Sequence, residues 1–146
     1  MLAAMTETEP TYTGGCLCGA VRFAAAGRPL WAAHCHCRSC RRSAGAPFAT
    51  FVGFAREQVT FTHAAPATYA SSPGVSRSFC ATCGTPIAYE AARFPGEIHL
   101  YACTLDDPAA VSPAAHVHVG EQLSWLRLAD GLPRYHTTSR EGEPLP

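Results

Sequence analysis

Seven of the eight cysteines fall into three tight clusters, and their spacing constrains the fold of this chain more than any other feature. In chain order the clusters are Cys16-Leu17-Cys18, Cys35-His36-Cys37-Arg38-Ser39-Cys40 and Cys80-Ala81-Thr82-Cys83. A glycine follows the first and third clusters, where a tight turn lets two thiolates point at one ion. Disulfides or bound metal must therefore account for most of these cysteines, and either would tie distant segments together.

The N-terminal residues bear on the choice between metal and disulfide, because they indicate a compartment. Residues 1–15 contain no basic residue and no apolar run of signal-peptide length, and nowhere do 18 apolar residues follow one another. We therefore expect a cytoplasmic protein without a membrane span, in which cysteines are more often metal ligands or catalytic groups than disulfides. A secreted form that has already lost its signal peptide is the alternative, and its cysteines would form disulfides.

The first and third clusters together offer four sulfurs. A structural zinc site is tetrahedral and fully ligated by the protein, so Cys16 and Cys18 with Cys80 and Cys83 form the simplest set. Disulfides or unligated core thiols are the alternatives for these four residues. Zinc of this kind contributes roughly 10 kcal/mol or more to folding. That contribution matters here, because the sequence is rich in alanine, glycine and proline and poor in large apolar side chains.

The middle cluster supplies three sulfurs, from Cys35, Cys37 and Cys40. Three protein ligands with one open position are typical of a catalytic zinc, whose fourth position takes water or substrate. A fourth protein ligand would instead close the site and make the zinc structural. The candidates for that ligand are the flanking His34 and His36, or residues brought near by folding: Cys103, His99, His116 and His118.

Short β-branched and aromatic segments recur between glycine and proline turns, a pattern typical of an all-β domain. Thr13-Gly14-Gly15 is one such turn signal. Helix is expected only in brief pieces, at Ser39–Ala44 and as a turn or two near Pro108–Ala110 or Gln122–Leu128. We predict a single domain over residues 11–136, with flexible tails at 1–10 and 137–146. The predicted strands are Ala20–Ala24, Leu30–Ala33, Phe48–Val52, Gln58–Thr62, Ala67–Ala70, Val75–Phe79, Pro86–Tyr89, Glu97–Ala102 and His116–Val119.

The charged residues narrow the chemistry further. The eleven basic residues are all arginine and balance eleven acidic ones. Without lysine there is no Schiff-base nucleophile and no phosphate-loop lysine, and the neutral balance disfavours a nucleic-acid surface. His34 and His36 are the nearest candidates for a general acid or base.

Three segments together resemble a known family: residues 14–23 (GGCLCGAVRF), 34–48 (HCHCRSCRRSAGAPF) and 79–87 (FCATCGTPI), with weaker likenesses at 104–108 and 131–135. They are similar to the glutathione-dependent formaldehyde-activating enzyme (GFA) family, whose domain is also called the centromere-protein-V domain. The likeness runs from about Thr11 to Tyr135. It implies a zinc-stapled β-sheet fold with two zinc ions per chain. The implied ligands are Cys16, Cys18, Cys80 and Cys83 for a structural zinc, and Cys35, Cys37 and Cys40 for a catalytic zinc.

In the characterised type, the reaction forms S-hydroxymethylglutathione from glutathione and formaldehyde, a carbon–sulfur lyase chemistry. The resemblance therefore implies a lyase whose partners are a small glutathione-like thiol and an aldehyde. Because glutathione has two carboxylates, the nearby Arg38, Arg41 and Arg42 are candidates for binding them, or are ordinary surface charges. Thiol addition suits a three-thiolate zinc, because the anionic ligands weaken the metal as an acid but leave a bound thiolate nucleophilic. A catalytically silent two-zinc binding or scaffold module is the alternative. A thiol redox protein using Cys80 and Cys83 is less favoured, because no βαβ pattern surrounds that motif.

Overall fold

The computed structural model describes residues 8–146, which form a mostly β structure with one seven-residue α-helix. Residues 1–7 of the predicted N-terminal tail lie outside the described residues. The α-helix is α1 (Arg38–Ala44), and short 3₁₀ turns cover Arg56–Gln58, Ala102–Thr104, Pro108–Ala110 and Val119–Glu121. The strands are β1 (Thr11–Gly15), β2 (Arg22–Ala26), β3 (Trp31–Cys35), β4 (Ala49–Ala55), β5 (Val59–Phe61), β6 (Ala67–Ser72), β7 (Val75–Phe79), β8 (Pro86–Ala91), β9 (Glu97–Tyr101) and β10 (His116–Val117).

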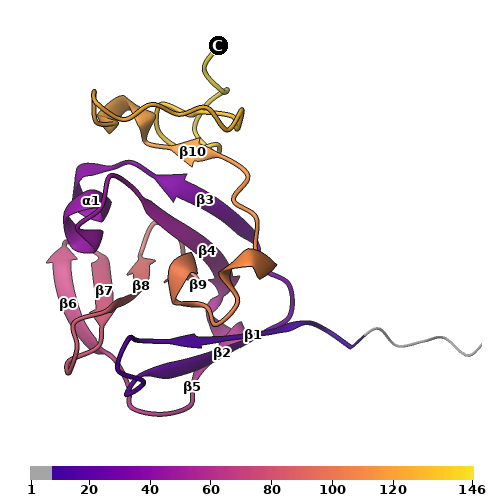
Figure 1. Cartoon of the computed structure of the whole chain (residues 1–146), viewed down its shortest axis with the longest axis vertical. Coiled ribbons are helices and arrows are strands. Elements are labelled where there is room, and N and C mark those ends of the chain that lie inside the picture. Colours follow the sequence, from indigo (N-terminus) through magenta and orange to yellow (C-terminus); the bar gives the residue numbers. More distant parts are fainter. Residues whose placement is uncertain (1–7) are drawn as a thin grey trace, which may run out of the picture.

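The strands are arranged in two sheets (Figure 1). The smaller sheet has the order β1-β2-β5, and the larger has the order β10-β3-β4-β9-β8-β7-β6. Neighbouring strands are antiparallel, except that β10 runs parallel to β3. Figure 1 shows the smaller sheet below the larger one and the C-terminal residues above β3, around β10.

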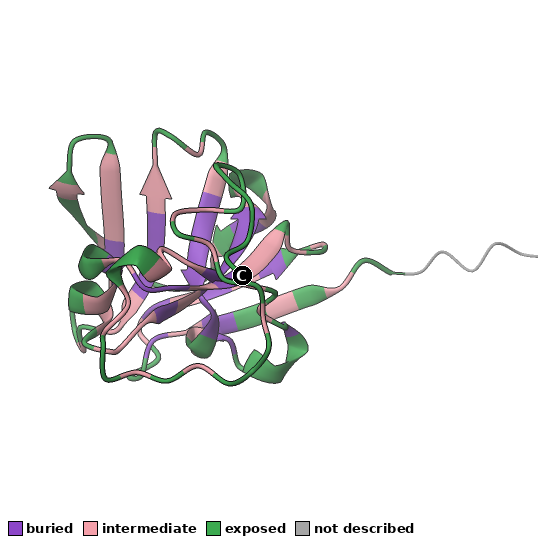
Figure 2. Ribbon diagram, turned by 90° about the horizontal axis from the view of Figure 1, so that it is seen from above, coloured by how far each residue is buried: buried purple, intermediate pink, exposed green. Residues whose placement is uncertain are grey.

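Alternation along β4 and β9 gives the larger sheet two different faces. Val52 and Phe54 of β4 and Ile98 and Leu100 of β9 are fully buried in one cluster with Phe23 of the smaller sheet. Burial of each such side chain contributes about 1.5–3 kcal/mol. The main core therefore lies between the two sheets, where the strands in the middle of Figure 2 are buried.

The other face of the larger sheet carries a second cluster. Phe51 of β4, Tyr89 of β8 and Tyr101 of β9 pack there with Cys35 and Cys40. The ring centroids of Phe51 and Tyr101 are 4.6 Å apart, and those of Phe51 and Tyr89 are 6.1 Å apart. The middle cysteine cluster thus sits on the face that the core leaves free.

The all-β fold predicted from the sequence is confirmed, since every predicted strand segment overlaps an observed strand. The helix predicted at Ser39–Ala44 is present as α1, and the piece predicted at Pro108–Ala110 is a 3₁₀ turn. Strand boundaries shift by a few residues, and β3 continues into Cys35, the first residue of the middle cluster.

One local prediction was wrong. The turn predicted at Thr13-Gly14-Gly15 is part of β1, where Gly14 serves a close approach: a Cβ there would overlap the Phe23 ring and the Thr104 carbonyl oxygen. Near Gln122–Leu128, the other place where a turn or two of helix was expected, the Leu126 amide donates to the Leu123 carbonyl at 3.1 Å, which makes a single turn and no longer helix. The apolar residues at 123, 125, 126 and 128 would spread around a helix and give it no apolar face.

The last part of the chain contacts the end of the larger sheet at which β10 lies. The Tyr135 amide donates to the His116 carbonyl (2.8 Å), and the His118 amide donates to the Thr137 carbonyl (2.7 Å). Within residues 137–146, predicted as a tail, Arg140 donates a hydrogen bond to Glu97 of β9 (2.8 Å). The C-terminal residues therefore help to build the surroundings of the free sheet face.

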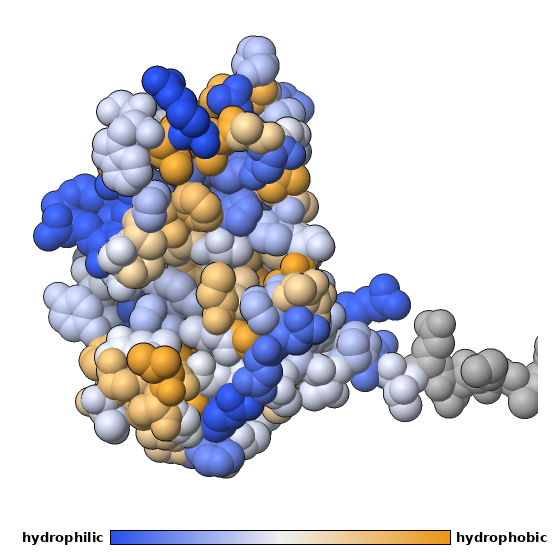
Figure 3. All heavy atoms as spheres, in the orientation of Figure 1, coloured by the Kyte–Doolittle hydropathy of each residue, from blue (hydrophilic) through white to orange (hydrophobic). Residues whose placement is uncertain are grey.

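The surface has a mixed character on the face drawn in Figure 3, where apolar residues form separate patches between polar ones. Within residues 8–146, no helix combines the length and the apolarity needed to cross a membrane.

Replacing Gly53 with alanine is expected to lower the free energy of unfolding by about 1–3 kcal/mol. Gly53 pairs with Trp31 across β3 and β4, and a Cβ at this position would overlap the indole ring. The G53A variant must displace the indole or separate the strands. Urea denaturation followed by circular dichroism measures the change.

Gly142 provides the matched control, because it has open space around it. The G142A variant should stay within about 0.5 kcal/mol of the wild type. A G53A variant as stable as G142A would contradict the close packing described here.

Candidate metal centres and active-site cavity

The first and third cysteine clusters meet in space. The thiols of Cys16, Cys18, Cys80 and Cys83 all lie within 4.8 Å of one another. The Sγ atoms of Cys16 and Cys18 are 3.6 Å apart, and those of Cys18 and Cys80 are 3.8 Å apart. A disulfide would hold two sulfurs at about 2.05 Å, so these cysteines are free thiols, and their spacing could hold a metal ion.

Two tight turns bring these four sulfurs together. In the turn after β1, the Val21 amide donates to Cys16 Sγ at 3.2 Å, and Gly19 has a φ of +81°. In the turn after β7, the Cys83 amide donates to Cys80 Sγ at 3.5 Å, and Gly84 has a φ of +79°. Glycine adopts these positive φ values without strain, which explains why a glycine follows each pair.

The hydrogen bonds at the second turn favour thiolate. The Thr85 hydroxyl lies 3.1 Å from Cys83 Sγ. Hydrogen bonds from the side chain and then the backbone of Thr85 lower the pKa of Cys83 to about 5. A thiol that ionises this readily is a suitable metal ligand, because the thiolate is the species that coordinates.

The middle cluster is assembled by the junction between β3 and α1. Cys35 ends β3, Cys37 caps the N-terminus of α1, and Cys40 lies in its first turn. The Cys40 amide donates to Cys37 Sγ at 3.3 Å, and the three thiols lie within 4.8 Å of one another. The sequence spacing C-x-C-x-x-C thus places three sulfurs around one point.

The pKa values of the three thiols show how each thiolate affects the ionisation of the others. Hydrogen bonds from Cys35 and Cys40, and to a lesser extent the charge of His118, lower the pKa of Cys37 to about 2. The neighbouring Cys37 and Cys40 sulfurs, together with burial, raise the pKa of Cys35. The three thiols alone therefore stabilise one negative charge, whereas a bound metal cation would stabilise three thiolates.

The donor chemistry of both sets fits zinc. All seven donors are cysteine thiols, and thiolate sulfur is a preferred zinc ligand. Four sulfurs complete a tetrahedral shell, as a structural site requires. Within the part of the chain that the structure describes, no fourth histidine, cysteine or carboxylate joins the set of three. None of the fourth-ligand candidates named from the sequence therefore belongs to this set of three.

A cavity of about 750 Å³ opens beside the three-cysteine set. Aromatic side chains form its walls, with Trp31 and Phe51 among them, and no aspartate or glutamate of the described chain lines it. The polar and charged side chains that line it are Ser39, Ser72, Arg77, Arg93, His99, His118, Thr138, Ser139 and Arg140.

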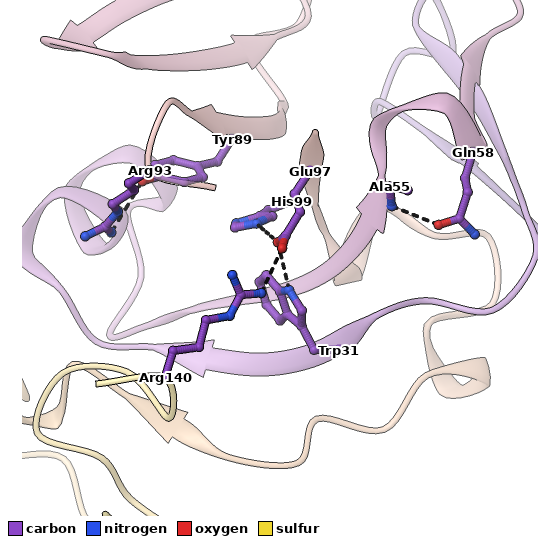
Figure 4. A network of polar contacts seen from close by, with 8 residues as sticks. All are labelled: Trp31, Ala55, Gln58, Tyr89, Arg93, Glu97, His99 and Arg140. Carbon is purple, nitrogen blue, oxygen red and sulfur yellow. Dashed lines mark hydrogen bonds and ion pairs between the residues drawn. The ribbon is translucent and has the colours of Figure 1, made fainter. Parts of the chain in front are cut away.

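Glu97 holds one wall of the cavity in place (Figure 4). Its carboxylate accepts hydrogen bonds from Trp31 Nε1 at 3.1 Å and Arg140 Nη2 at 2.8 Å, and it lies 2.9 Å from His99 Nε2. Burial alone would raise the pKa of Glu97, but the hydrogen bonds from Arg140, His99 and Trp31 outweigh it and lower that pKa. A carboxylate that is 14% exposed therefore connects the C-terminal segment to β3 and β9.

The arginines that face the cavity differ from those that the sequence suggested. Arg38 and Arg42 are exposed on α1, and Arg41 donates through Nε to the His36 carbonyl at 3.1 Å. None of these three lines the cavity, whereas Arg77, Arg93 and Arg140 do. The lining arginines come from β7, the loop after β8 and the C-terminal segment, so proximity in sequence to the cysteines could not find them. The one sequence signal was Arg77 on the strand that leads into Cys80.

His34 and His36 point away from the cavity into a network of their own. His36 Nε2 lies 2.8 Å from His116 Nδ1, and His116 Nε2 lies 2.8 Å from Asp130 Oδ2. The distances among His34, His116 and Asp130 would also suit a metal ion. However, the His34 and His116 rings are stacked at 4.6 Å and 27°. A metal lies in the plane of each imidazole that binds it, so stacked rings are poorly oriented to share one.

Comparison with known proteins identifies the family. A family model described as glutathione-dependent formaldehyde-activating enzyme matches residues 11–121, about three quarters of the chain. The chain belongs to this GFA family. All seven clustered cysteines lie within the matched range.

Two individual proteins resemble this GFA-family chain. An uncharacterized lyase of Schizosaccharomyces pombe is 34% identical over 80 residues, which cover 55% of this chain and 58% of that protein. The chain thus spans little more than half the length of this curated relative. A crystal structure of a Rhodobacter sphaeroides protein has a TM-score of 0.56 at 24% identity, covering 69% of this chain and 91% of that one. This second likeness concerns the fold.

Replacing Cys80 with serine is expected to remove one zinc equivalent and the cooperative unfolding transition. The set of four cysteines that includes Cys80 joins two turns that are far apart in sequence. Zinc in such a site contributes roughly 10 kcal/mol to folding. Metal analysis and thermal unfolding measure the two effects. The C103S variant is the matched control, since Cys103 is an exposed cysteine outside both sets. Unchanged zinc content in C80S would contradict the assignment.

Replacing Glu97 with glutamine should lower the pKa of His99 below its value in the wild type. Burial already lowers the pKa of His99 by disfavouring the imidazolium, and Glu97 opposes this effect. Without the carboxylate, the opposing interaction is lost. NMR titration of the His99 ring measures the shift. The E141Q variant, at an exposed residue outside this network, should leave the His99 pKa unchanged.

Proposed function

We propose that this protein is a zinc-dependent carbon–sulfur lyase acting in the cytoplasm on the adduct of a small thiol and an aldehyde. The most specific substrate pair is glutathione and formaldehyde, with S-hydroxymethylglutathione as the adduct. The observation that carries the proposal is the set Cys35, Cys37 and Cys40, which faces a cavity and gains no fourth ligand from the described chain. The family match supports the reaction class.

The two cysteine sets have separate roles in this proposal. Cys16, Cys18, Cys80 and Cys83 hold a structural zinc that joins the turns after β1 and β7. Cys35, Cys37 and Cys40 hold the catalytic zinc. When bound there, zinc supplies a cation that stabilises a substrate thiolate and polarises an aldehyde oxygen.

The cavity residues bind the substrate and exclude water. The Arg93 guanidinium lies 4.8 Å from the centroid of the Phe94 ring, and Nη2 donates to the Tyr89 hydroxyl at 3.4 Å. No carboxylate pairs with Arg93 in the described chain, so its remaining donors can bind a substrate carboxylate. The Trp31, Phe51 and Tyr89 rings surround the reacting groups with apolar surface.

A proton must move during the addition. The thiol loses its proton, a carbon–sulfur bond forms, and the aldehyde oxygen takes up a proton as its double bond opens. His118 is the imidazole best placed to carry it, because it lines the cavity and its charge influences Cys37. His34 and His36, the candidates from sequence, lie outside the cavity lining.

Catalysis is tested by NMR exchange between formaldehyde, glutathione and their adduct at equilibrium, compared with the uncatalysed exchange rate. Zinc-loaded wild-type protein should accelerate exchange, and C37S should abolish the acceleration, because it removes one of three ligands. Two bound zinc ions without acceleration by any of several thiols would leave the silent two-zinc module as the function.

The R93Q variant should raise the KM for glutathione about tenfold, while the KM for an uncharged thiol such as 2-mercaptoethanol stays the same. A charge-assisted hydrogen bond to a carboxylate contributes about 1.5–3 kcal/mol, which is lost for glutathione alone. R42Q is the matched control, because Arg42 is exposed and does not line the cavity. An equal change for both thiols would show that Arg93 does not bind the carboxylate.

A further inference from the structure

Arg77 contacts Cys40, and the proposed reaction assigns no role to this contact. Both Nη atoms of its guanidinium lie 3.8 Å from Cys40 Sγ. Its Nε donates to the Ser71 hydroxyl at 3.3 Å, and its Cζ lies 5.0 Å from the centroid of the Tyr89 ring. Ser71 of β6 and the Tyr89 ring thus hold the guanidinium in place. Its two Nη groups donate to Cys40, one of the three clustered cysteines.

This position matters because of the charge around the metal. Three thiolates and one divalent cation carry a net charge of −1, and a substrate thiolate in the fourth position would make it −2. In the described chain, Arg77 is the one charged side chain that donates a hydrogen bond to these sulfurs. The cavity is also free of aspartate and glutamate, so no carboxylate neutralises this guanidinium.

We propose that Arg77 is a positioning residue that lets the three-cysteine metal site accept an anionic fourth ligand. The inference rests on the proposed function, because it takes a metal to be bound by Cys35, Cys37 and Cys40. The guanidinium offsets the negative charge that each thiolate adds, so it favours a thiolate over a neutral ligand. It acts through the Cys40 sulfur and need not touch the substrate.

The shape of arginine suits this task. A planar guanidinium can direct two N–H groups at one sulfur while its face lies on Tyr89. A lysine would supply the same charge as a single point and could not make both contacts. We therefore expect R77K to keep part of the preference for anions and R77M to lose it.

The test uses protein loaded with Co²⁺, whose absorption spectrum reports directly on the ligands of the site. The loaded protein is titrated separately with 2-mercaptoethanol, which binds as a thiolate, and with imidazole, which binds as a neutral ligand. The R77M variant should weaken thiol binding by about ten- to hundredfold, with R77K in between. Imidazole binding should change less than twofold in both variants.

Controls separate this effect from general damage to the site. Metal analysis confirms that each variant carries two Co²⁺ ions before titration. R42M removes an arginine on α1 that does not contact the sulfurs, and it should leave both affinities unchanged. Equal weakening of thiol and imidazole in R77M, or no change in thiol binding, would overturn the proposal.

Failure of this inference is distinguishable from failure of the proposed function. If wild-type protein binds the thiol with the stated dependence on Arg77 but does not accelerate formaldehyde exchange, the proposed reaction is wrong and the role of Arg77 stands. If exchange is accelerated while R77M binds thiols like the wild type, the reaction stands and the role of Arg77 is wrong. Absence of thiol binding by the wild type overturns the role of Arg77.

Discussion

The convergence of Cys16, Cys18, Cys80 and Cys83 is the constraint on which the rest of the structure depends. One pair follows β1 of the smaller sheet, and the other follows β7 of the larger sheet. A metal ion bound by both pairs, as proposed above, would join the two sheets around the shared core of Phe23, Phe54 and their neighbours. Such a cross-link would add stability to a β-rich chain in which few large apolar side chains are available for burial.

The larger sheet then serves two purposes because successive residues point to opposite faces. Val52 and Phe54 contribute to the core, whereas Phe51 belongs to the second cluster with Cys35 and Cys40. The β3–α1 junction supplies three sulfurs at one end of the cavity, and Glu97 organises Trp31, His99 and Arg140 at the wall. Groups from β3, α1, β4, β9 and the C-terminal segment thus meet on one face of the larger sheet.

The sequence was sufficient for those features that depend on local spacing. Strands, α1 and both cysteine sets could be predicted, because ligand pairs and alternating residues are neighbours along the chain. Arg77, Arg93 and Arg140 could not be predicted as cavity residues, since their positions depend on how distant strands and the C-terminal segment pack. The turn predicted at Gly14 was wrong for a related reason. Glycine is needed there because the Phe23 ring approaches closely, and the sequence alone does not distinguish a close approach from a turn.

The placement of Trp31 also makes the cavity observable without any added label. The chain has two tryptophans, and Trp125 is 67% exposed, whereas Trp31 lies in the cavity wall with its indole nitrogen bound to Glu97. A cationic quencher such as caesium would suppress emission from Trp125 far more than emission from Trp31, because arginines line the cavity around Trp31. The remaining fluorescence would come mainly from Trp31. It would therefore change when a ligand fills the cavity, so a residue of the cavity wall would report binding directly.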